Sequence, residues 1–104
     1  MTSPELPLIQ LSAYEDIAVI ADRVESYAGK AAAEKTTDKI LAGIDLLATT
    51  PYLGPLHQDP MLARSGFRKL VIGKHVVVYR IYNNRATVLR VFHGSSNYEP
   101  KMGA

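Results

Sequence analysis

Three runs rich in valine, isoleucine and aromatic residues fill most of the second half of the chain, and they constrain the fold more than any other feature. They cover residues 67–72, 75–82 and 86–93, with the sequences FRKLVI, HVVVYRIY and ATVLRVFH. The gaps between them hold Gly73 and the Asn83-Asn84 pair, and both residue types accept the positive φ of tight hairpin turns. This pattern predicts a three-stranded antiparallel meander.

The first half has the spacing of a short strand followed by two helices. Residues 7–11 (PLIQL) predict the strand, and Ser12 with Glu15 three residues later predicts a capped helix start. A second helix is expected over residues 31–48, ended by Pro51. Each helix has an apolar stripe at helical spacing: Ile17, Ile20, Ala21, Val24 and Ala28 on the first, and Ile40, Ile44, Leu47 and Ala48 on the second.

The expected fold is therefore α+β: an N-terminal strand, a helical hairpin and a three-stranded antiparallel meander, with the helices packed on one face of the sheet. Residues 51–66 hold three prolines and two glycines and are expected to cross the surface as a loop. The polar tail from Gly94 is expected to leave the sheet quickly. A chain of 104 residues fits one domain, so we expect a single domain over residues 1–104.

Composition excludes several kinds of site. The chain has no cysteine, so it has no disulfide, no thiolate metal site and no cysteine nucleophile. His57, His75 and His93 lack ligand-like spacing, and we expect neither a metal nor another cofactor. No apolar run approaches the roughly 20 residues that cross a bilayer, and the N-terminus lacks the pattern of a signal peptide. The expected location is the cytoplasm, with no membrane partner.

Charge is divided between the two halves of the chain. Residues 1–50 hold eight acidic and four basic residues, a net charge of −4, and residues 51–104 hold two acidic and eight basic residues, a net charge of +6. This division predicts a basic face formed by the C-terminal half, suited to nucleic acid or to an acidic protein surface. An ordinary solvated surface is the alternative.

Strand alternation predicts one apolar and one cationic face for the meander. The apolar face is expected to include Val77, Tyr79 and Ile81, and the opposite face to include Val76, Val78, Arg80 and Tyr82 of the middle strand with Val88, Arg90 and Phe92 of the last strand. The second face is expected to be at least partly open, because unpaired arginines are costly to bury. Arg80 and Arg90 are expected to be neighbours, and guanidinium groups beside rings suit phosphates, bases or acidic side chains.

The order of these features resembles the toxin subunits of the RelE/ParE superfamily, which belong to bacterial type II toxin–antitoxin pairs. The resemblance runs from about Ile9 to Tyr98 and rests on LLATTPYLG, FRKLVIGKHVVVYRI and ATVLRVFHGSSNY. It implies the fold expected above and a cognate antitoxin whose C-terminal segment wraps the toxin, so that operator DNA is bound only indirectly. The most specific pieces are the Leu47…Pro51…Gly54 helix exit, Arg68-x-Leu70, Tyr79-Arg80 and a final strand that enters His93-Gly94.

Two activities divide this superfamily. The ParE branch, whose members stabilise plasmids, inhibits DNA gyrase and so replication, whereas the RelE branch cleaves mRNA in the ribosomal A site. The stretch VFHGSSNY is more similar to the ParE branch, and the segment before Phe67 offers only Arg64 where the mRNA-cleaving members have a lysine cluster. The resemblance therefore favours a growth-inhibiting toxin that acts on gyrase. A ribosome-dependent mRNA endoribonuclease is the alternative, so enzymatic activity stays open.

The candidate site residues differ between the two branches. In a ribonuclease, Arg80 and Arg90 would stabilise charge on the phosphate. His93 would carry the proton, and Tyr98 would stack on a base or act as an acid. In a binding protein, the residues expected to contact the target or the antitoxin are Arg64, Arg68, Arg80, Tyr82, Arg90 and Phe92, and Arg68 can equally anchor the loop to the sheet.

The tail departs from the ParE branch at two positions. Ser96 and Asn97 stand where members of that branch often carry a basic or amide residue and an aspartate. The charge that those members carry at these two positions is therefore missing here. A third possibility is a member that binds an antitoxin and no longer intoxicates.

Overall fold

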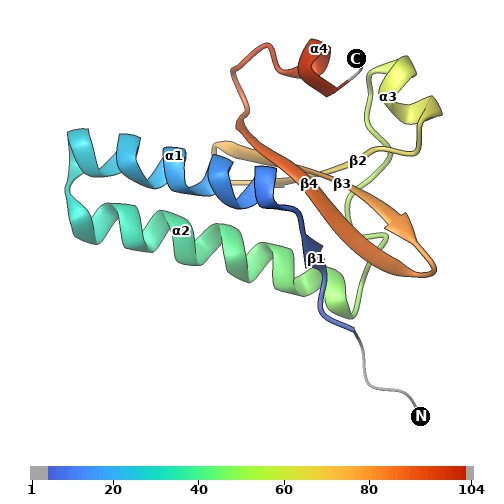
Figure 1. The fold of residues 1–104 in the computed structure, drawn as a ribbon, viewed down its shortest axis with the longest axis horizontal. Coiled ribbons are helices and arrows are strands. Elements are labelled where there is room, and N and C mark those ends of the chain that lie inside the picture. The colour runs from blue at the N-terminus through green and yellow to red at the C-terminus, as the bar shows by residue number, and fades with distance from the viewer. Residues whose placement is uncertain (1–4, 103–104) are drawn as a thin grey trace.

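The computed structural model, which describes residues 5–102, contains a helical hairpin packed against a four-stranded sheet (Figure 1). The long helices are α1 (Leu11–Ala28) and α2 (Lys30–Asp45), and α2 continues into the 3₁₀ turn η1 (Leu46–Ala48). The strands are β1 (Leu8–Ile9), β2 (Arg68–Ile72), β3 (His75–Tyr82) and β4 (Arg85–His93), and the short helices are α3 (Pro60–Arg64) and α4 (Glu99–Met102). This arrangement confirms the predicted α+β fold. None of the described helices is long and apolar enough to cross a membrane.

The sheet has the strand order β1-β4-β3-β2. β2, β3 and β4 form the predicted antiparallel meander, and β1 joins it by pairing in parallel with the start of β4. The N-terminal strand is shorter than the predicted residues 7–11, because only Leu8 and Ile9 pair before the chain enters α1. The predicted turns are confirmed: Asn83 and Asn84 have φ of 51° and 63°, and Gly73 has φ of 60°.

The start of α1 differs from the prediction. The helix begins at Leu11, its N-cap is Gln10, and no side chain caps it. Ser12, the predicted cap, lies inside the first turn and donates instead to the carbonyl of Leu89 at 2.9 Å. The capping prediction was wrong because tertiary structure decides how the chain enters the helix: the Gln10 amide donates to the Val88 carbonyl as the last bond of the β1–β4 pairing.

Residues 51–66 were predicted to be a loop, and that prediction missed α3. Asp59 caps this helix by accepting hydrogen bonds from the amides of Met61 and Leu62 at 2.9 and 3.2 Å. Pro60 occupies the first turn, where the missing N–H costs nothing. The Asp-Pro signal was present in the sequence, and the helix buries Leu62 against the sheet.

Two apolar clusters lie on opposite faces of the sheet. The first, here the helix-side core, joins the hairpin to one face and contains Ala13, Ile17, Ile40, Ile44, Leu47, Val77, Tyr79, Ala86, Val88 and Val91. The second, here the second-face cluster, contains Leu62, Phe67, Val76, Val78, Phe92 and Tyr98. In Figure 1, α3 and α4 lie across the sheet from the hairpin. The second face is therefore less open than expected, since α3 and the tail cover its middle.

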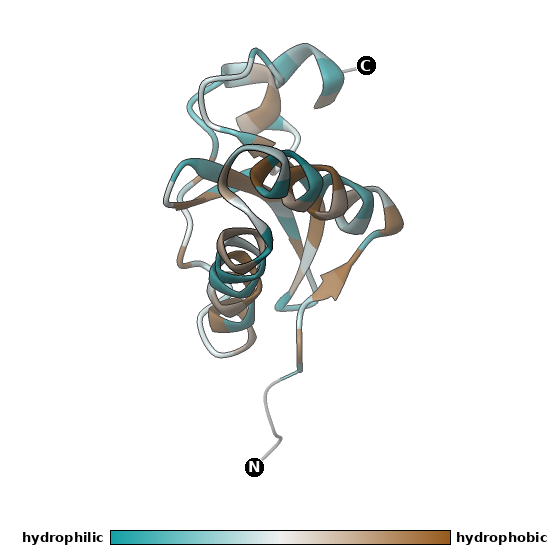
Figure 2. Ribbon diagram, turned by 90° about the vertical axis from the view of Figure 1, so that its left-hand side faces the viewer, coloured by the Kyte–Doolittle hydropathy of each residue, from teal (hydrophilic) through white to brown (hydrophobic). Residues whose placement is uncertain are grey.

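The two long helices are amphipathic, and Figure 2, which looks along them, shows hydrophobic and hydrophilic segments alternating around each one. The predicted stripe residues Ile17, Val24, Ile40 and Ile44 are buried. Ala28, also predicted to face inward, is exposed. It lies in the last turn of α1, at the end of the hairpin that extends away from the sheet (Figure 1).

β4 contains one residue more than its partner strand requires. Val78 pairs with Arg90 and the next residue, Tyr79, pairs with Val88, so Leu89 is the extra residue of a β-bulge. The bulge switches the alternation of side chains along β4.

Three expectations about β4 were wrong because strict alternation fails at this bulge. Val88, grouped with Arg90 and Phe92, lies instead in the helix-side core. Leu89, expected on the opposite face, packs against the second-face cluster. Arg80 and Arg90 were expected to be neighbours, but Arg80 lies opposite Thr87.

Candidate functional site

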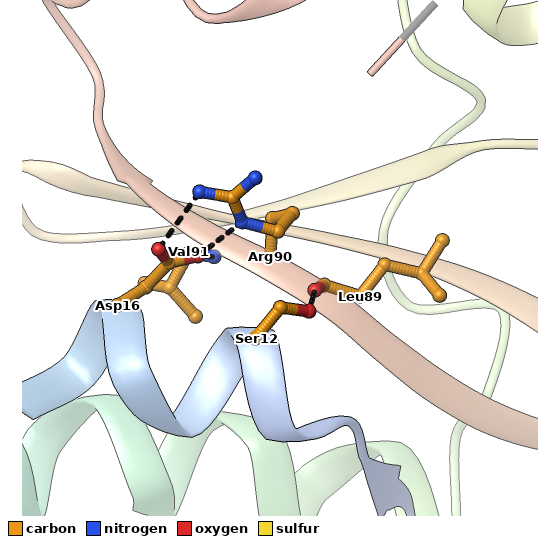
Figure 3. Close-up of polar contacts among 5 residues, drawn as sticks. All are labelled: Ser12, Asp16, Leu89, Arg90 and Val91. Carbon is orange, nitrogen blue, oxygen red and sulfur yellow. Dashed lines mark hydrogen bonds and ion pairs between the residues drawn. The ribbon is translucent and has the colours of Figure 1, made fainter. Parts of the chain in front are cut away.

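The bulge in β4 is where α1 is fastened to the sheet (Figure 3). Asp16 accepts hydrogen bonds from Arg90 Nε at 2.7 Å, from Arg90 Nη2 at 2.9 Å and from the Val91 amide at 2.9 Å. One turn earlier, Ser12 bonds the Leu89 carbonyl. Hydrogen bonding to Asp16 raises the pKa of Arg90 above its ordinary value. Arg90 was predicted to contact a target. In the structure its Nε and Nη2 already bond Asp16 of the same chain.

Arg80 lies on the second face between two rings. Its guanidinium carbon is 4.8 Å from the centroid of Phe67 and 5.5 Å from that of Tyr82, within the range of cation–π attraction. Arg80 is half-buried, Tyr82 is exposed, and no hydrogen bond or ion pair of the Arg80 side chain occurs within residues 5–102. The rings hold the guanidinium in place, and its donors remain available to a carboxylate or phosphate.

Arg68 anchors the loop that follows η1. Its Nε donates to the Gly54 carbonyl at 2.7 Å, and its guanidinium lies 5.0 Å from the ring centroid of Tyr52. Tyr79 secures the same loop: its hydroxyl donates to the Pro51 carbonyl at 2.8 Å and accepts from the Gly54 amide at 2.9 Å. A Cβ on Gly54 would lie 2.3 Å from the Lys69 carbonyl oxygen, so this close approach requires glycine. The expectation that Tyr79 is a core residue is confirmed.

Tyr98 is buried, with 3% of its surface exposed, and it holds the tail on the second face. Its ring stacks on Phe92 with centroids 4.7 Å apart, and its hydroxyl lies 2.6 Å from His57 Nε2. The Asp59 amide donates to His57 Nδ1 at 3.0 Å, so the ring proton of the neutral histidine is on Nε2 and is donated to Tyr98. Burial, with a smaller effect of Lys69, lowers the pKa of His57, and burial raises the pKa of Tyr98.

Sequence reasoning missed His57 because a single histidine in a proline-rich segment carries no periodic signal. The available clue was local. His57 stands two residues before Asp59, the cap of α3, and the Asp59 amide is the group that fixes the imidazole tautomer. His57 is the polar partner that makes burial of the Tyr98 hydroxyl possible.

His93 lies at the end of β4, at the opposite end of the β3–β4 pairing from Arg80. It is directly opposite His75, and their ring centroids are 5.6 Å apart with the planes at 80°. The Ser95 amide donates to His93 Nδ1 at 3.1 Å. Burial and the nearby His93 and Lys74 lower the pKa of His75. Across residues 5–102, no group of three or more histidine, aspartate or glutamate side chains is arranged to hold a metal ion.

The structure therefore brings together only part of the predicted site. Arg80 and Tyr82 adjoin each other on the second face, and the guanidinium also lies beside Phe67, a member of the second-face cluster. Arg64, at the end of α3, is exposed. The residues occupied elsewhere are Arg68 on the loop, Arg90 on Asp16, Phe92 and Tyr98 in the second-face cluster, and His93 at the far end of β4.

Comparison with known proteins gives a family and a fold. Residues 8–98 match the family model described as ParE toxin of type II toxin–antitoxin system, parDE. Among solved structures, one described as the chromosomal ParDE TA system from P. aeruginosa has a similar fold, with a TM-score of 0.71 and 18% sequence identity over 85% of this chain and 96% of the other. No curated protein sequence matches the chain.

Proposed function

Because the chain belongs to the ParE toxin family of type II toxin–antitoxin systems, we propose that it arrests growth by binding and inhibiting DNA gyrase until its cognate antitoxin neutralises it. The observation that carries the proposal is the separation of the candidate catalytic groups. A toxin that works by binding needs a surface, whereas a nuclease needs an acid, a base and a charged group around one phosphate.

The candidate nuclease residues are far apart along the sheet. Arg80 and His75 are five residues apart on β3, which corresponds to roughly 16 Å at strand spacing, and His93 lies opposite His75. The Tyr98 hydroxyl is buried and accepts a hydrogen bond from His57 Nε2. No proton carrier among the described candidates therefore lies beside Arg80, and this disfavours the ribonuclease alternative.

The surface that we assign to the target is the Arg80 patch, formed by Arg80, Tyr82 and Phe67. Rings hold its guanidinium, so little side-chain entropy is lost when a partner carboxylate binds. Arginine and tyrosine are also the residue types that most often dominate the energy of protein–protein interfaces. The patch lies on the half of the chain with a net charge of +6.

The test is a supercoiling assay with purified gyrase and the free toxin. We expect the wild-type toxin to block supercoiling, and Arg80→Ala to raise the half-inhibitory concentration about tenfold or more. Lys35→Ala, which removes an exposed cation of α2, is the matched control and should act as wild type. Unchanged supercoiling at micromolar excess of wild-type toxin would overturn the proposal. Codon-phased cuts in mRNA after brief induction would replace it with ribosome-dependent cleavage.

A further inference from the structure

A pocket of about 370 Å³ lies between the helical hairpin and the turn that joins β2 to β3, and it is called here the hairpin pocket. Two of its walls come from α1 and α2, toward the end of the hairpin that extends away from the sheet (Figure 1). The third wall is the chain from Ile72 to His75. His75 opens β3 and Arg80 lies five residues further along the strand, so the hairpin pocket is separate from the Arg80 patch.

The inner part of the hairpin pocket is aliphatic. Val24 of α1 and Ile40 of α2 line it and are buried, with 7% and 1% of their surface exposed. Ile72 of β2 lines the third wall and packs against the helix-side core. The pocket therefore gives an apolar ligand body access to the edge of the core, where the apolar surface that it covers is removed from water.

The rim of the hairpin pocket is cationic. Lys39 of α2 and Lys74 of the turn line it and are exposed. Lys39 extends over the turn, because its Nζ lies 3.5 Å from the point that a Cβ on Gly73 would occupy. Neither ammonium group has an ion pair or a hydrogen bond within residues 5–102, and none of the described lining residues is an aspartate or a glutamate. The negative charge that would balance this rim must therefore come from an occupant.

Two uncharged polar groups lie between the apolar part and the rim. The Thr36 hydroxyl and the half-buried His75 ring both line the pocket. Neither has a hydrogen-bond partner within the described part of the chain, although the His75 ring contacts His93 edge-on. Burial and the nearby His93 and Lys74 keep the imidazole of His75 neutral at pH 7 by lowering its pKa. Both groups can therefore donate a hydrogen bond to an anionic head without adding charge.

The size and the lining of the hairpin pocket fit a small molecule. Pockets that bind small ligands commonly have volumes of roughly 300–1,000 Å³, an apolar lining and a few polar groups. The cations of the described lining are lysines, and none is an arginine, whose planar fork is the best match for a phosphate. An ammonium group acts as a point charge, which a single carboxylate is sufficient to balance.

We propose that the hairpin pocket binds a small amphipathic carboxylate. Its apolar body packs on Val24, Ile40 and Ile72, and its head pairs with the two lysines of the rim. Bound in this way, the ligand contacts α1, α2 and the β2–β3 turn at once and stabilises the folded chain. The inference does not depend on the gyrase proposal, since the binding is a property of the free toxin.

The test titrates the full-length free toxin with octanoate while the imidazole resonances of its histidines are followed by NMR. We expect saturable binding that shifts the His75 resonances and raises the pKa of His75, because a nearby anion favours the imidazolium form. His57, buried beside Tyr98 on the second face, is the internal control and should not respond. Absence of saturable binding, or binding that leaves His75 unchanged, would overturn the proposal.

Matched ligands separate the contribution of the head from that of the body. Acetate keeps the carboxylate and lacks the chain, and octylammonium keeps the chain and carries the opposite charge. Each should bind about tenfold or more weakly than octanoate. Acetate binding as tightly as octanoate would mean that the apolar part of the pocket is not used, and equal binding of octylammonium would mean that the lysines are not used. Either result would contradict the proposal.

Variants of the rim complete the test. Lys39→Gln with Lys74→Gln removes both charges at exposed positions, where the fold should tolerate the change, and should weaken octanoate binding roughly fivefold to tenfold. Lys35→Gln removes an exposed charge of α2 that does not line the pocket and should bind octanoate as wild type does. High salt should weaken binding to the wild type more than to the double variant. Equal affinity of the double variant and the Lys35 control would show that the rim does not hold the carboxylate and would remove the basis of the proposal.

Discussion

The apolar clusters on the two faces of the sheet differ in residue composition and in what covers them. The helix-side core is almost entirely aliphatic and is covered by two helices of 18 and 16 residues. The second-face cluster is smaller and richer in aromatic residues, and it is covered by a five-residue helix and a tail. It also contains a polar pair, His57 with Tyr98, that the helix-side core lacks.

This difference separates stability from recognition. A core covered by long helices cannot rearrange without unfolding, so it serves as the scaffold. The cover of the second face is attached through few side chains, and the Arg80 patch lies at its margin. Binding surfaces are commonly carried by segments of lower local stability. The following predictions test whether the two faces differ in this way.

The largest effect on stability is expected when leucine is replaced by alanine, once in each of the two clusters. Leu47 and Leu62 are 1% and 2% exposed, in the helix-side core and the second-face cluster respectively. Leu47→Ala should lower the free energy of unfolding by about 4 kcal/mol, because the long helices cannot close around the cavity, and Leu62→Ala by about 2–3 kcal/mol, because α3 can move inward. Urea denaturation of both variants measures this. Equal losses would contradict the contrast between the faces.

A smaller loss is expected at the attachment of α1 to the bulge. Asp16→Ala leaves Arg90 and the Val91 amide without their acceptor and should cost about 2–3 kcal/mol. Glu15→Ala removes a neighbouring exposed carboxylate and should change stability by less than about 0.5 kcal/mol. Chemical denaturation of the two variants side by side measures the difference. If the two variants lose the same amount of stability, the attachment of α1 to the bulge does not contribute to the free energy of unfolding.

Removal of the Tyr98 hydroxyl should lower the free energy of unfolding by a smaller amount. Tyr98→Phe keeps the stack on Phe92 but leaves the buried His57 Nε2–H without an acceptor, at a cost of about 1–2 kcal/mol. Because the tail alone loses its anchor, we expect limited proteolysis after Gly94 to accelerate in this variant while the helices stay protected. A uniform increase in cleavage along the chain would instead mean that the tail and the core unfold together.

The smallest effect is a pH dependence. Burial lowers the pKa of His57 and of His75 in the folded state below the ordinary value of 6.5. The unfolded chain therefore takes up protons that the folded chain does not, so this part of the stability is fully present above pH 6.5 and is lost as pH falls through the folded pKa values. The urea midpoint should decline as the pH falls below 6.5. His57→Gln should make that decline shallower, and an identical slope would remove His57 from the explanation.

Much of the fold could be predicted because local signals agreed with each other. The Asn83-Asn84 turn, the apolar stripes and the alternating strands each indicated the same meander and hairpin. Two errors arose where tertiary contacts override local chemistry. Ser12 has the sequence context of a cap but bonds a strand 77 residues away, and no local signal marks Leu89 as a bulge.

The site was less predictable for the same reason. Counting arginines in the C-terminal half suggested a continuous cationic surface, but two of them are matched by acids of the N-terminal half. Arg90 pairs with Asp16, and Arg85 pairs with Glu5 at 3.1 Å. Those pairings depend on how the bulge and β1 bring the halves together, which spacing along the chain cannot reveal. Arg80 was identified by its strand position, and its enclosure by two rings was not.

The extra residue in β4 also determines how this strand tolerates changes of length. Ala86 and Val88 face the helices before Leu89, and Val91 faces them after it. Deleting Leu89 would join Val88 to Arg90 in regular alternation and leave every flanking side chain on its present face. A deletion elsewhere along the β3–β4 pairing would turn all later side chains to the opposite face. Position 89 is thus a point at which this strand can lose one residue and keep the facing of both clusters, giving up local twist, the packing of the Leu89 side chain on the second-face cluster and the bond to Ser12.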